Sequence, residues 1–598
     1  MTYTTRILTL HSSDSIISPT MASSSSHNPE DDETLMPFSC YECRNRKLKC
    51  DRLSPRCTRC SRSEVRCQYP ATRKRPVITA TRPRVKELES RLVELENRLK
   101  ATQEEGYQSF RPFDSPESDL IETGRFEQLP PQDVVEELTN TFFTIIQNES
   151  RFIHPSRYQA SLYQPPHMQP PMCLQYMVLA LAASASPAHK QLAQPFYRRA
   201  RYYYEADELK GEGEYFVTLA HAQTCLLMEH FEVQNLWFSR SSMSTSKGVR
   251  LAQIMGLHQL DGEGGLSQTL PPPKDWCEQE ERRRTLWAIF CGDRNTSSTT
   301  GWPSLMDVQR INTKLPASEE AFQLGVEEAS TTLTEAINGD KSQCSYFACR
   351  VLATHLFHEC LDHTYQDRPD DNPTDIQNST FWKRHEDLNN GLATTFITLP
   401  ESLRTSTAYN RNATMINLQL HTATICLHRT GVARAKKHNI PLEVLFGTQV
   451  RLLPAADAIF GIVASLADVT GMFRNPMVAF ASYMAAYVFL EDYTSFQNHD
   501  SEMKMNALMD LMITIGQENP ITASVAVQMA HELRKTGIDP SAVNKVAGLM
   551  AKMDLKGPLL GKQDKAAGSV IFCPFEAPSG SGPQGVPSEF PRGNMGIM

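Results

Sequence analysis

Six cysteines near the start of the chain have the spacing of ligands in a metal cluster. The unit C-x2-C-x6-C occurs twice, separated by six residues, and its cysteines are Cys40, Cys43, Cys50, Cys57, Cys60 and Cys67. Structural zinc is tetrahedral and commonly bound by cysteine thiolates. Two such ions require eight bonds, which six thiolates supply only if two sulfur atoms bridge. The spacing therefore predicts two Zn²⁺ per chain.

The symmetry of this repeat indicates which sulfurs bridge. The equivalent first members of the two halves are Cys40 and Cys57. One zinc would then take Cys43 and Cys50 as terminal ligands, and the other would take Cys60 and Cys67. So short a segment has almost no apolar core, so metal binding must supply most of its folding free energy. A metal-storage or redox peptide and a zinc module that binds another protein are the alternatives.

Basic residues are concentrated in and after the cysteine cluster. Residues 40–86 contain 15 Lys and Arg but only 3 Asp and Glu, although the whole chain has a net charge of −8. A basic segment on an acidic chain predicts a polyanionic partner for that segment. Arg and Lys neutralise DNA phosphates and also read guanine in the major groove. The run Arg73, Lys74 and Arg75 also fits a nuclear import signal or a plain solvated stretch.

Residues 40–99 resemble the fungal-type Zn2Cys6 binuclear-cluster transcription factors. The resemblance rests on the run Cys43-Arg-Asn-Arg-Lys-Leu-Lys-Cys50-Asp51, on Pro55 between the two halves, and on the order cluster, linker, short helix. It implies that a short helix enters the major groove of double-stranded DNA and reads a CGG-type triplet. The implied base contacts come from Arg46 and above all Lys47. The implied phosphate contacts come from Arg44, Lys49, Arg52 and Arg59.

A second resemblance covers roughly residues 135 to 320. The stretches Phe152-Ile-His-Pro155, Val249-Arg-Leu-Ala-Gln-Ile-Met-Gly-Leu-His258 and Gly301-Trp-Pro303 are similar to the fungal-specific transcription factor regulatory domain, or middle homology region. The resemblance implies an all-helical scaffold that controls activity and is open to a small-molecule effector. We expect Arg282 to Arg284 and Asp293 to form internal ion pairs that position helices.

The elements that must position these residues follow from apolar patterning, which predicts a mainly α fold. Val85, Leu88, Leu92, Leu95 and Leu99 alternate at steps of three and four, as in a coiled coil that would make a homodimer. A single amphipathic helix packed on its own protein is the alternative. The predicted order is a disordered tail (1–39), the zinc module (40–67), a basic linker (68–84), the coiled coil (85–100), a linker (101–130), an all-helical regulatory domain (131–555) and a disordered tail (556–598).

Neither a membrane protein nor an enzyme is expected. The longest strongly apolar stretch, Met477 to Leu490, has 14 residues, whereas a spanning helix needs roughly 20. The best cluster for catalysis is His355, His358, Cys360 and His363, but it lacks the H-E-x-x-H order of zinc proteases. We interpret these as ordinary helix residues.

The sequence as a whole predicts a nuclear, sequence-specific transcription factor. It would bind paired triplets as a homodimer and act on the transcription machinery at RNA polymerase II genes. The family resemblance favours a metabolic or secondary-metabolite biosynthetic gene set. The competing hypothesis is a zinc-containing interaction protein that recruits partners without reading DNA. Replacement of Lys47 by alanine distinguishes the two.

Overall fold

The computed structural model divides the chain into two compact units, Met1–Pro112 and Phe113–Met598. It describes residues 36, 38–70, 130–147, 151–262, 269–339, 341–365, 371–372, 374–375, 378–404, 410–440, 450–539 and 541–552. The predicted coiled coil lies outside these residues. The predicted tails and linkers lie wholly or largely outside them.

The described part of the first unit contains two one-turn helices, α1 (Tyr41–Asn45) and α2 (Thr58–Arg62). Among its described residues, the buried side chains are those of Cys40, Cys43, Cys57 and Cys60, against which Cys50, Cys67 and Tyr69 pack. An apolar cluster this small cannot stabilise a fold by burial alone. The centre of this unit is therefore a group of cysteine thiols rather than a hydrophobic core.

The described part of the second unit is helical, which confirms the predicted fold class. Its elements are α5 (Gln132–Thr141), η1 (Phe142–Ile146), α6 (Pro155–Leu162), η2 (Pro166–Met168), α7 (Met172–Ala185), η3 (Lys190–Leu192), α8 (Ala193–Glu208), η4 (Glu214–Phe216), α9 (Leu219–Gln234), α10 (Phe238–Ile254), η5 (Leu257–Gln259), α11 (Trp276–Thr300), η6 (Val308–Arg310), α12 (Glu319–Leu324), α13 (Leu333–Asn338), α14 (Tyr346–Tyr365), α15 (Thr380–Thr398), α16 (Glu401–Arg404), α17 (Arg411–Lys437), α19 (Leu452–Ala464), α20 (Val469–Met472), α21 (Pro476–Phe496), α22 (His499–Gly516), α23 (Pro520–Lys535), α24 (Ala542–Lys545) and α25 (Ala547–Lys552).

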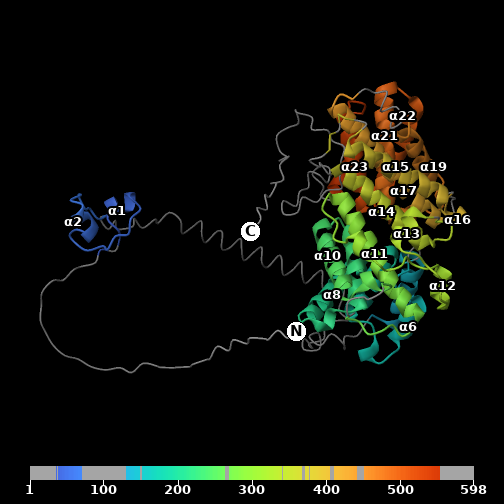
Figure 1. Cartoon of the computed structure of the whole chain (residues 1–598), viewed down its shortest axis with the longest axis horizontal. Helices are drawn as coiled ribbons and strands as arrows, with labels where there is room; N and C mark the ends of the chain where they lie inside the picture. The colour runs from blue at the N-terminus through green and yellow to red at the C-terminus, as the bar shows by residue number, and fades with distance from the viewer. Residues whose placement is uncertain are drawn as a thin grey trace, which may run out of the picture. The chain divides into compact units, whose positions relative to one another are not determined.

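Two hydrophobic cores meet along α14. Residues from α7, α9, α10 and α11 form the first core, and residues from α17, α19, α21, α22 and α23 form the second. Val351 and Leu352 of α14 belong to the first core, whereas Ala353 and Phe357 belong to the second. Figure 1 shows α8, α10 and α11 towards one end of this unit and α21, α22 and α23 towards the other, with α14 between them.

The longest strongly apolar stretch, Met477 to Leu490, lies in α21 and is largely buried in the second core. In α21, every residue from Val478 to Ala486 is buried, because a helix that is apolar on all sides needs neighbours all around it. The buried Ser482 hydroxyl donates to the Val478 carbonyl at 2.8 Å, so this polar group is satisfied within the helix. None of the described helices has the length and apolar character required to cross a membrane.

Ion pairs of Arg283 and Arg284 connect α11 to neighbouring segments. Arg283 pairs with Asp261 and Arg284 pairs with Glu319 of α12, which confirms the prediction for these two arginines. Arg282 contacts Glu278 at 2.6 Å, but both residues lie on α11, so this pair positions no second helix and the prediction is wrong for Arg282. The prediction is wrong for Asp293. Its carboxylate accepts hydrogen bonds from the backbone N–H groups of Leu305 and Met306 at 3.0 and 3.1 Å, so it holds the loop after α11.

Candidate metal centre and nucleic-acid interface

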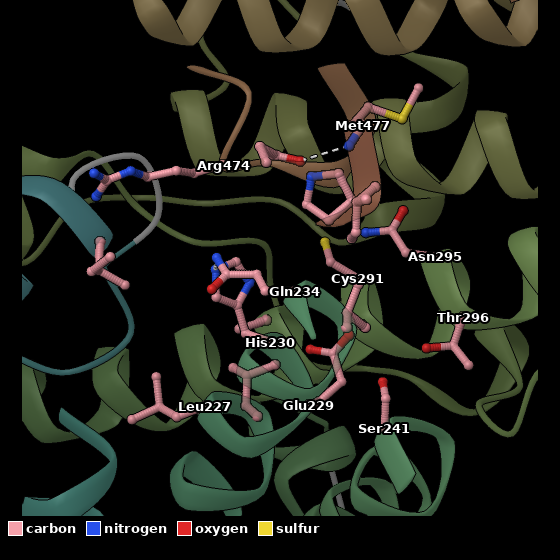
Figure 2. Close-up of a pocket in the computed structure, with 18 of the residues that line it drawn as sticks. Leu227, Glu229, His230, Gln234, Ser241, Cys291, Asn295, Thr296, Arg474 and Met477 are labelled. Atoms are coloured by element: carbon pink, nitrogen blue, oxygen red, sulfur yellow. Dashed lines mark hydrogen bonds between the residues drawn. The ribbon is translucent and has the colours of Figure 1, made fainter. Parts of the chain in front are cut away.

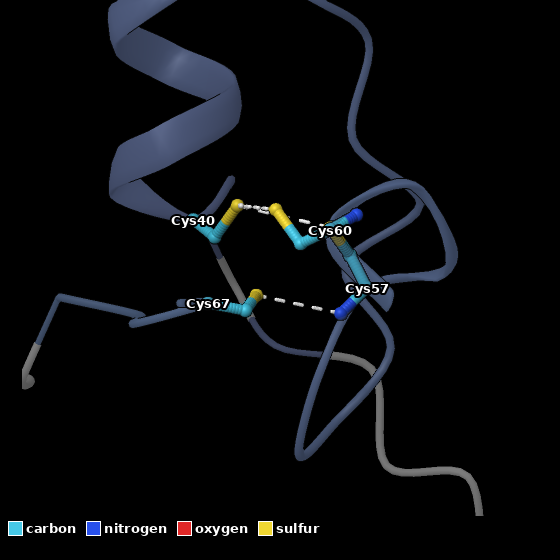
Figure 3. A group of neighbouring side chains, drawn as sticks. All are labelled: Cys40, Cys57, Cys60 and Cys67. Atoms are coloured by element: carbon cyan, nitrogen blue, oxygen red, sulfur yellow. Dashed lines mark hydrogen bonds between the residues drawn. The ribbon is translucent and has the colours of Figure 1, made fainter. Parts of the chain in front are cut away.

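The structure brings the six cysteine sulfurs of the first unit together in two overlapping groups of four. Each group has all its sulfur atoms within 4.8 Å of one another, and Figure 3 shows the group that contains Cys60 and Cys67. The other group contains Cys43 and Cys50. Cys40 and Cys57 belong to both groups. This overlap is the arrangement that two bridging sulfurs require.

The sulfur separations fit tetrahedral zinc. A Zn–S bond of about 2.3 Å implies an S–S edge of about 3.8 Å in a tetrahedron. The Sγ–Sγ distances are 3.8 Å for Cys40–Cys57, 3.7 Å for Cys40–Cys60 and 3.7 Å for Cys43–Cys57. Six soft thiolate donors at this spacing suit two Zn²⁺ ions.

Electrostatics explain why the cluster needs a metal. Burial, together with the Cys57 thiol, raises the pKa of Cys60 to about 12. Burial also raises the pKa values of Cys40 and Cys43. Burial acts in the same direction on Cys57 and Cys67, but hydrogen bonds from backbone N–H groups and neighbouring thiols lower their pKa values. For Cys40, Cys43 and Cys60 the thiolate form is therefore unfavourable until a bound cation replaces the proton.

The two halves of the sequence repeat have the same backbone conformation. The Cys40 sulfur accepts the N–H of Cys43 at 3.4 Å, and the Cys57 sulfur accepts the N–H of Cys60 at 3.4 Å, so each sulfur caps a helix. After α1 and α2, the chain turns through equivalent residues with φ of +52°, which are Lys47 and Glu64. The sequence period of 17 residues is thus a structural period as well.

Two further contacts hold the loop between the halves. The Asp51 carboxylate accepts the backbone N–H of Thr58 at 3.0 Å. Hydrogen bonding with the Thr58 side chain, and to a smaller extent with this N–H, lowers the pKa of Asp51. The Tyr69 hydroxyl donates to the Leu53 carbonyl at 2.7 Å. In the sequence, Asp51 stands out only as the residue that follows Cys50 in the cysteine motif. Its role as a helix cap follows from a fold that brings Asp51 to the start of α2.

The predicted DNA-contacting cations are all exposed: Arg44, Arg46, Lys47, Lys49, Arg52 and Arg59. Arg46 is the C-cap residue that follows the last helical residue of α1, and Lys47 comes next. Both therefore lie just beyond the helix rather than within it. Arg46 Nε contacts Glu42 Oε1 at 2.7 Å. Glu42 was not singled out from the sequence, although its spacing of four residues from Arg46 is a signal for such a pair.

The remaining predicted interface residues lie outside the described part of the chain. These are the import-signal residues Arg73, Lys74 and Arg75 and the dimerisation residues Val85, Leu88, Leu92, Leu95 and Leu99. They stay predictions.

The α14 histidines have separate environments. His358 contacts Arg294 Nη1 at 3.2 Å and Ser298 Oγ at 3.3 Å. His355 faces Glu359 at 3.7 Å, and His363 stacks on Phe381 with ring centroids 4.4 Å apart. Within the described ranges these residues do not gather as a metal-ligand group.

Comparison with known proteins gives two family matches. Residues 38–76 match the fungal Zn(2)-Cys(6) binuclear cluster domain, and residues 139–391 match the fungal specific transcription factor domain. Both domains occur in the order predicted from the sequence.

Three relatives carry names of transcription regulators rather than enzymes. The chain is 32% identical to the pigment biosynthesis transcriptional activator pigB of Monascus ruber over 39% of this chain and 43% of that protein. It is 30% identical to the citrinin biosynthesis transcriptional activator mrl3 of Monascus ruber over 37% of this chain and 44% of that protein. It is 25% identical to sorbicillinoid biosynthetic cluster transcription factor 1 of Penicillium rubens over 61% of this chain and 65% of that protein. The chain thus spans less than half of the first two relatives and about two thirds of the third.

Proposed function

Since the chain belongs to the fungal Zn(2)-Cys(6) binuclear cluster transcription factors, we propose that it is a zinc-dependent, sequence-specific DNA-binding regulator of transcription. The six cysteines would hold two zinc ions, with Cys40 and Cys57 bridging. Zinc would supply the folding free energy of the module, while the cations around it would contact DNA. The proposal places the protein in the nucleus, in contact with the transcription machinery of RNA polymerase II.

One observation carries this proposal: residues 44–47, at the end of α1, carry three cations, whereas the equivalent residues 61–64, at the end of α2, carry one cation and one acid. The first half presents Arg44, Arg46 and Lys47 at and after the end of α1. The equivalent positions of the second half, 17 residues later, are Ser61, Ser63 and Glu64. A purely structural zinc module gains nothing from this difference. A module that places the turn after α1 against a polyanion is favoured by it.

Lys47 and Glu64 offer a matched pair of variants, because they have equivalent positions and the same φ. We expect Lys47→Ala to weaken binding to a CGG-containing duplex by about 10- to 100-fold, the usual effect of losing one base-reading side chain. Glu64→Ala should leave the affinity unchanged or raise it slightly. Fluorescence anisotropy at fixed salt measures both effects, and mass spectrometry under native conditions should find two zinc ions in each variant.

A different outcome would favour the competing function. If Lys47→Ala retained zinc and still bound the CGG duplex as tightly as wild type, or if wild type bound a scrambled duplex equally well, the module would not read DNA. The protein would then act through recruitment of partners.

We further propose that the chain binds two triplets as a homodimer through residues 85–100. The seam Val85, Leu88, Leu92, Leu95 and Leu99 covers about two heptads, so the dimer should be weak without DNA. Leu92→Glu should convert dimers to monomers in sedimentation experiments and reduce affinity for paired triplets much more than for a single triplet. An unchanged preference for paired sites would contradict this role.

The names of the relatives suggest the class of target genes. The relatives above are named for pigment, citrinin and sorbicillinoid biosynthesis. We propose that this chain regulates a metabolic gene set of the same kind, a secondary-metabolite biosynthetic cluster, and that its helical unit responds to a small-molecule effector. Chromatin immunoprecipitation with sequencing should find the protein upstream of clustered biosynthetic genes.

A further inference from the structure

A cavity of about 260 Å³ lies inside the helical unit, where its two cores meet. Its wall includes Leu227 of α9 and Ala288 of α11 from the first core, and Phe480 of α21 and Val525 of α23 from the second. Ligand pockets in proteins are commonly about 300 to 1,000 Å³. The cavity lies just below this range, so it suits a compact small molecule and is too small for a peptide.

Most of the wall is apolar. Six phenylalanines take part in it, and they are Phe142, Phe152, Phe238, Phe347, Phe357 and Phe480. An occupant must therefore bury an apolar body against these rings.

A cation lies on one side of the cavity. Arg474 donates from Nη2 to the Ala185 carbonyl at 3.0 Å, but its buried Nη1 has no hydrogen-bond partner among the described residues. Burial lowers the pKa of Arg474, while the nearby Asp468 acts in the opposite direction. The Asp468 carboxylate itself accepts from Arg411 at 3.3 Å and from the Gly471 N–H at 2.8 Å. A buried guanidinium with an unused donor favours an anionic partner.

Neutral polar groups lie on the other side. Burial and the neighbouring Glu232 raise the pKa of Glu229 to about 8, so this carboxyl group is largely protonated at neutral pH. Burial lowers the pKa of His230 to about 4, and the Gln234 side chain lies 3.1 Å from its Nε2. Figure 2 shows Arg474 and Glu229 on different sides, with His230 and Gln234 between them.

The ionisable groups of the wall thus leave an excess of positive charge. Besides Arg474, the wall contains Arg350 and Arg411, of which Arg411 is paired with Asp468, and its only acid among the described residues is Glu229. The Ser242 hydroxyl, also in the wall, has no hydrogen-bond partner within the described structure. Two unpartnered polar atoms in one cavity are expected where a ligand supplies the missing bonds.

We propose that this cavity binds a small apolar carboxylic acid, with the carboxylate at Arg474 and the apolar body among the phenylalanines. The inference specifies the effector of the proposed function, and it rests on that function only for the regulatory consequence of binding. The acid contacts both cores at once, so it stabilises their arrangement across α14.

The test uses the full-length, zinc-loaded protein and two probes of equal shape, the anion 2-naphthoate and the neutral 2-naphthamide. Isothermal titration should show one saturable site that binds the acid at least tenfold more tightly than the amide. Arg474→Gln should reduce naphthoate affinity at least tenfold and leave naphthamide binding unchanged. The matched control is Arg310→Gln, which removes a cation whose side chain is 81% exposed and which lies outside the cavity wall, and it should change neither affinity.

A second variant tests the cavity independently, in case the Arg474 variant fails to fold. Ala288→Leu adds side-chain volume to the wall and should weaken both probes at least tenfold. Equal affinities for acid and amide in wild type, or naphthoate binding that Ala288→Leu leaves intact, would overturn the proposal, as would the absence of saturable binding. These titrations contain no DNA, so their failure leaves the DNA-binding proposal standing, and failure of the Lys47→Ala test leaves this one standing.

Discussion

Arg284 is a fully buried cation whose donors are shared among five partners. Its guanidinium contacts Glu280 and Glu319, and it donates to the backbone carbonyls of Arg151, Ala317 and Ser318. A residue of this kind joins α11 to the start of α12 and to the segment before α6. The sequence predicted that such ion pairs exist, but the choice of partners depends on the tertiary fold.

Removal of the Arg284 charge should strongly lower the stability of the helical unit. Arg284→Met leaves Glu280 buried without its main partner, so we expect the free energy of unfolding to fall by about 3 to 5 kcal/mol. The comparison is Arg157→Met, whose partner Asp275 is about half-exposed, and there the loss should be about 1 kcal/mol or less. Urea unfolding followed by circular dichroism measures both. Equal losses would show that the burial of the Arg284 network does not matter for stability.

At the scale of helices, α22 and α23 approach so closely that Gly516 is required. A Cβ atom at Gly516 would lie 2.9 Å from Ala523 Cα, a backbone atom that cannot move aside without shifting α23. Gly516→Ala should therefore lower the free energy of unfolding by about 1 to 3 kcal/mol. The same change at Gly461 of α19, where no described atom lies within 4 Å of a Cβ, should raise it by about 0.5 to 1 kcal/mol. Stabilisation by both changes in chemical denaturation would refute the close approach.

Three histidines join α14, α15 and α17 within the second core. The ring centroids of His363 and His385 lie 5.6 Å apart, and those of His385 and His428 lie 5.5 Å apart. Their ring nitrogens have no hydrogen-bond partners among the described residues. Burial is the main cause that lowers their pKa values, to about 3 for His363, about 4 for His385 and about 3 for His428. These imidazoles are neutral in the folded protein at pH 5.

Acid should destabilise the fold through these histidines. Below the ordinary pKa of 6.5 the unfolded chain binds protons that the folded chain rejects, so stability is full above about pH 6.5 and decreases as the pH falls towards 4. His385→Phe removes one such group, so the loss of stability between pH 7 and pH 5 should be about 2 kcal/mol smaller than in wild type. Denaturant unfolding at the two pH values tests this, and identical losses in the two proteins would contradict it.

On the scale of the whole molecule, the two units have separate sources of stability. We expect chelation of zinc to unfold residues 40–67, because their buried centre consists of cysteines, and to leave the helical unit folded on its own two cores. Hydrogen exchange with mass spectrometry should show loss of protection in peptides from residues 40–67 and unchanged protection in α17 and α21. Loss of protection in both units would show that the helical unit depends on the metal.

How far the sequence predicts this molecule depends on the range of the interactions involved. The cysteine spacing and the apolar run of α21 are local patterns, and from them the metal chemistry and the helical fold class can be predicted. The cap that Asp51 provides and the loop that Asp293 holds depend on how the chain turns over the next 7 and 12 residues, and the cavity beside Arg474 depends on segments distant in sequence. Apolar periodicity contains no information about which distant segments meet.

Because the two halves of the cysteine module have the same backbone conformation, we expect a few side chains to decide which half contacts the duplex. Exchange of Arg44, Arg46 and Lys47 with Ser61, Ser63 and Glu64 would transfer the cationic end to α2 while both turns, with φ of +52°, stay as they are. Such a swapped protein should still fold with metal but present α2, instead of α1, to the duplex. The direction in which the chain leaves the duplex, and hence the allowed arrangement of paired half-sites, would change with it.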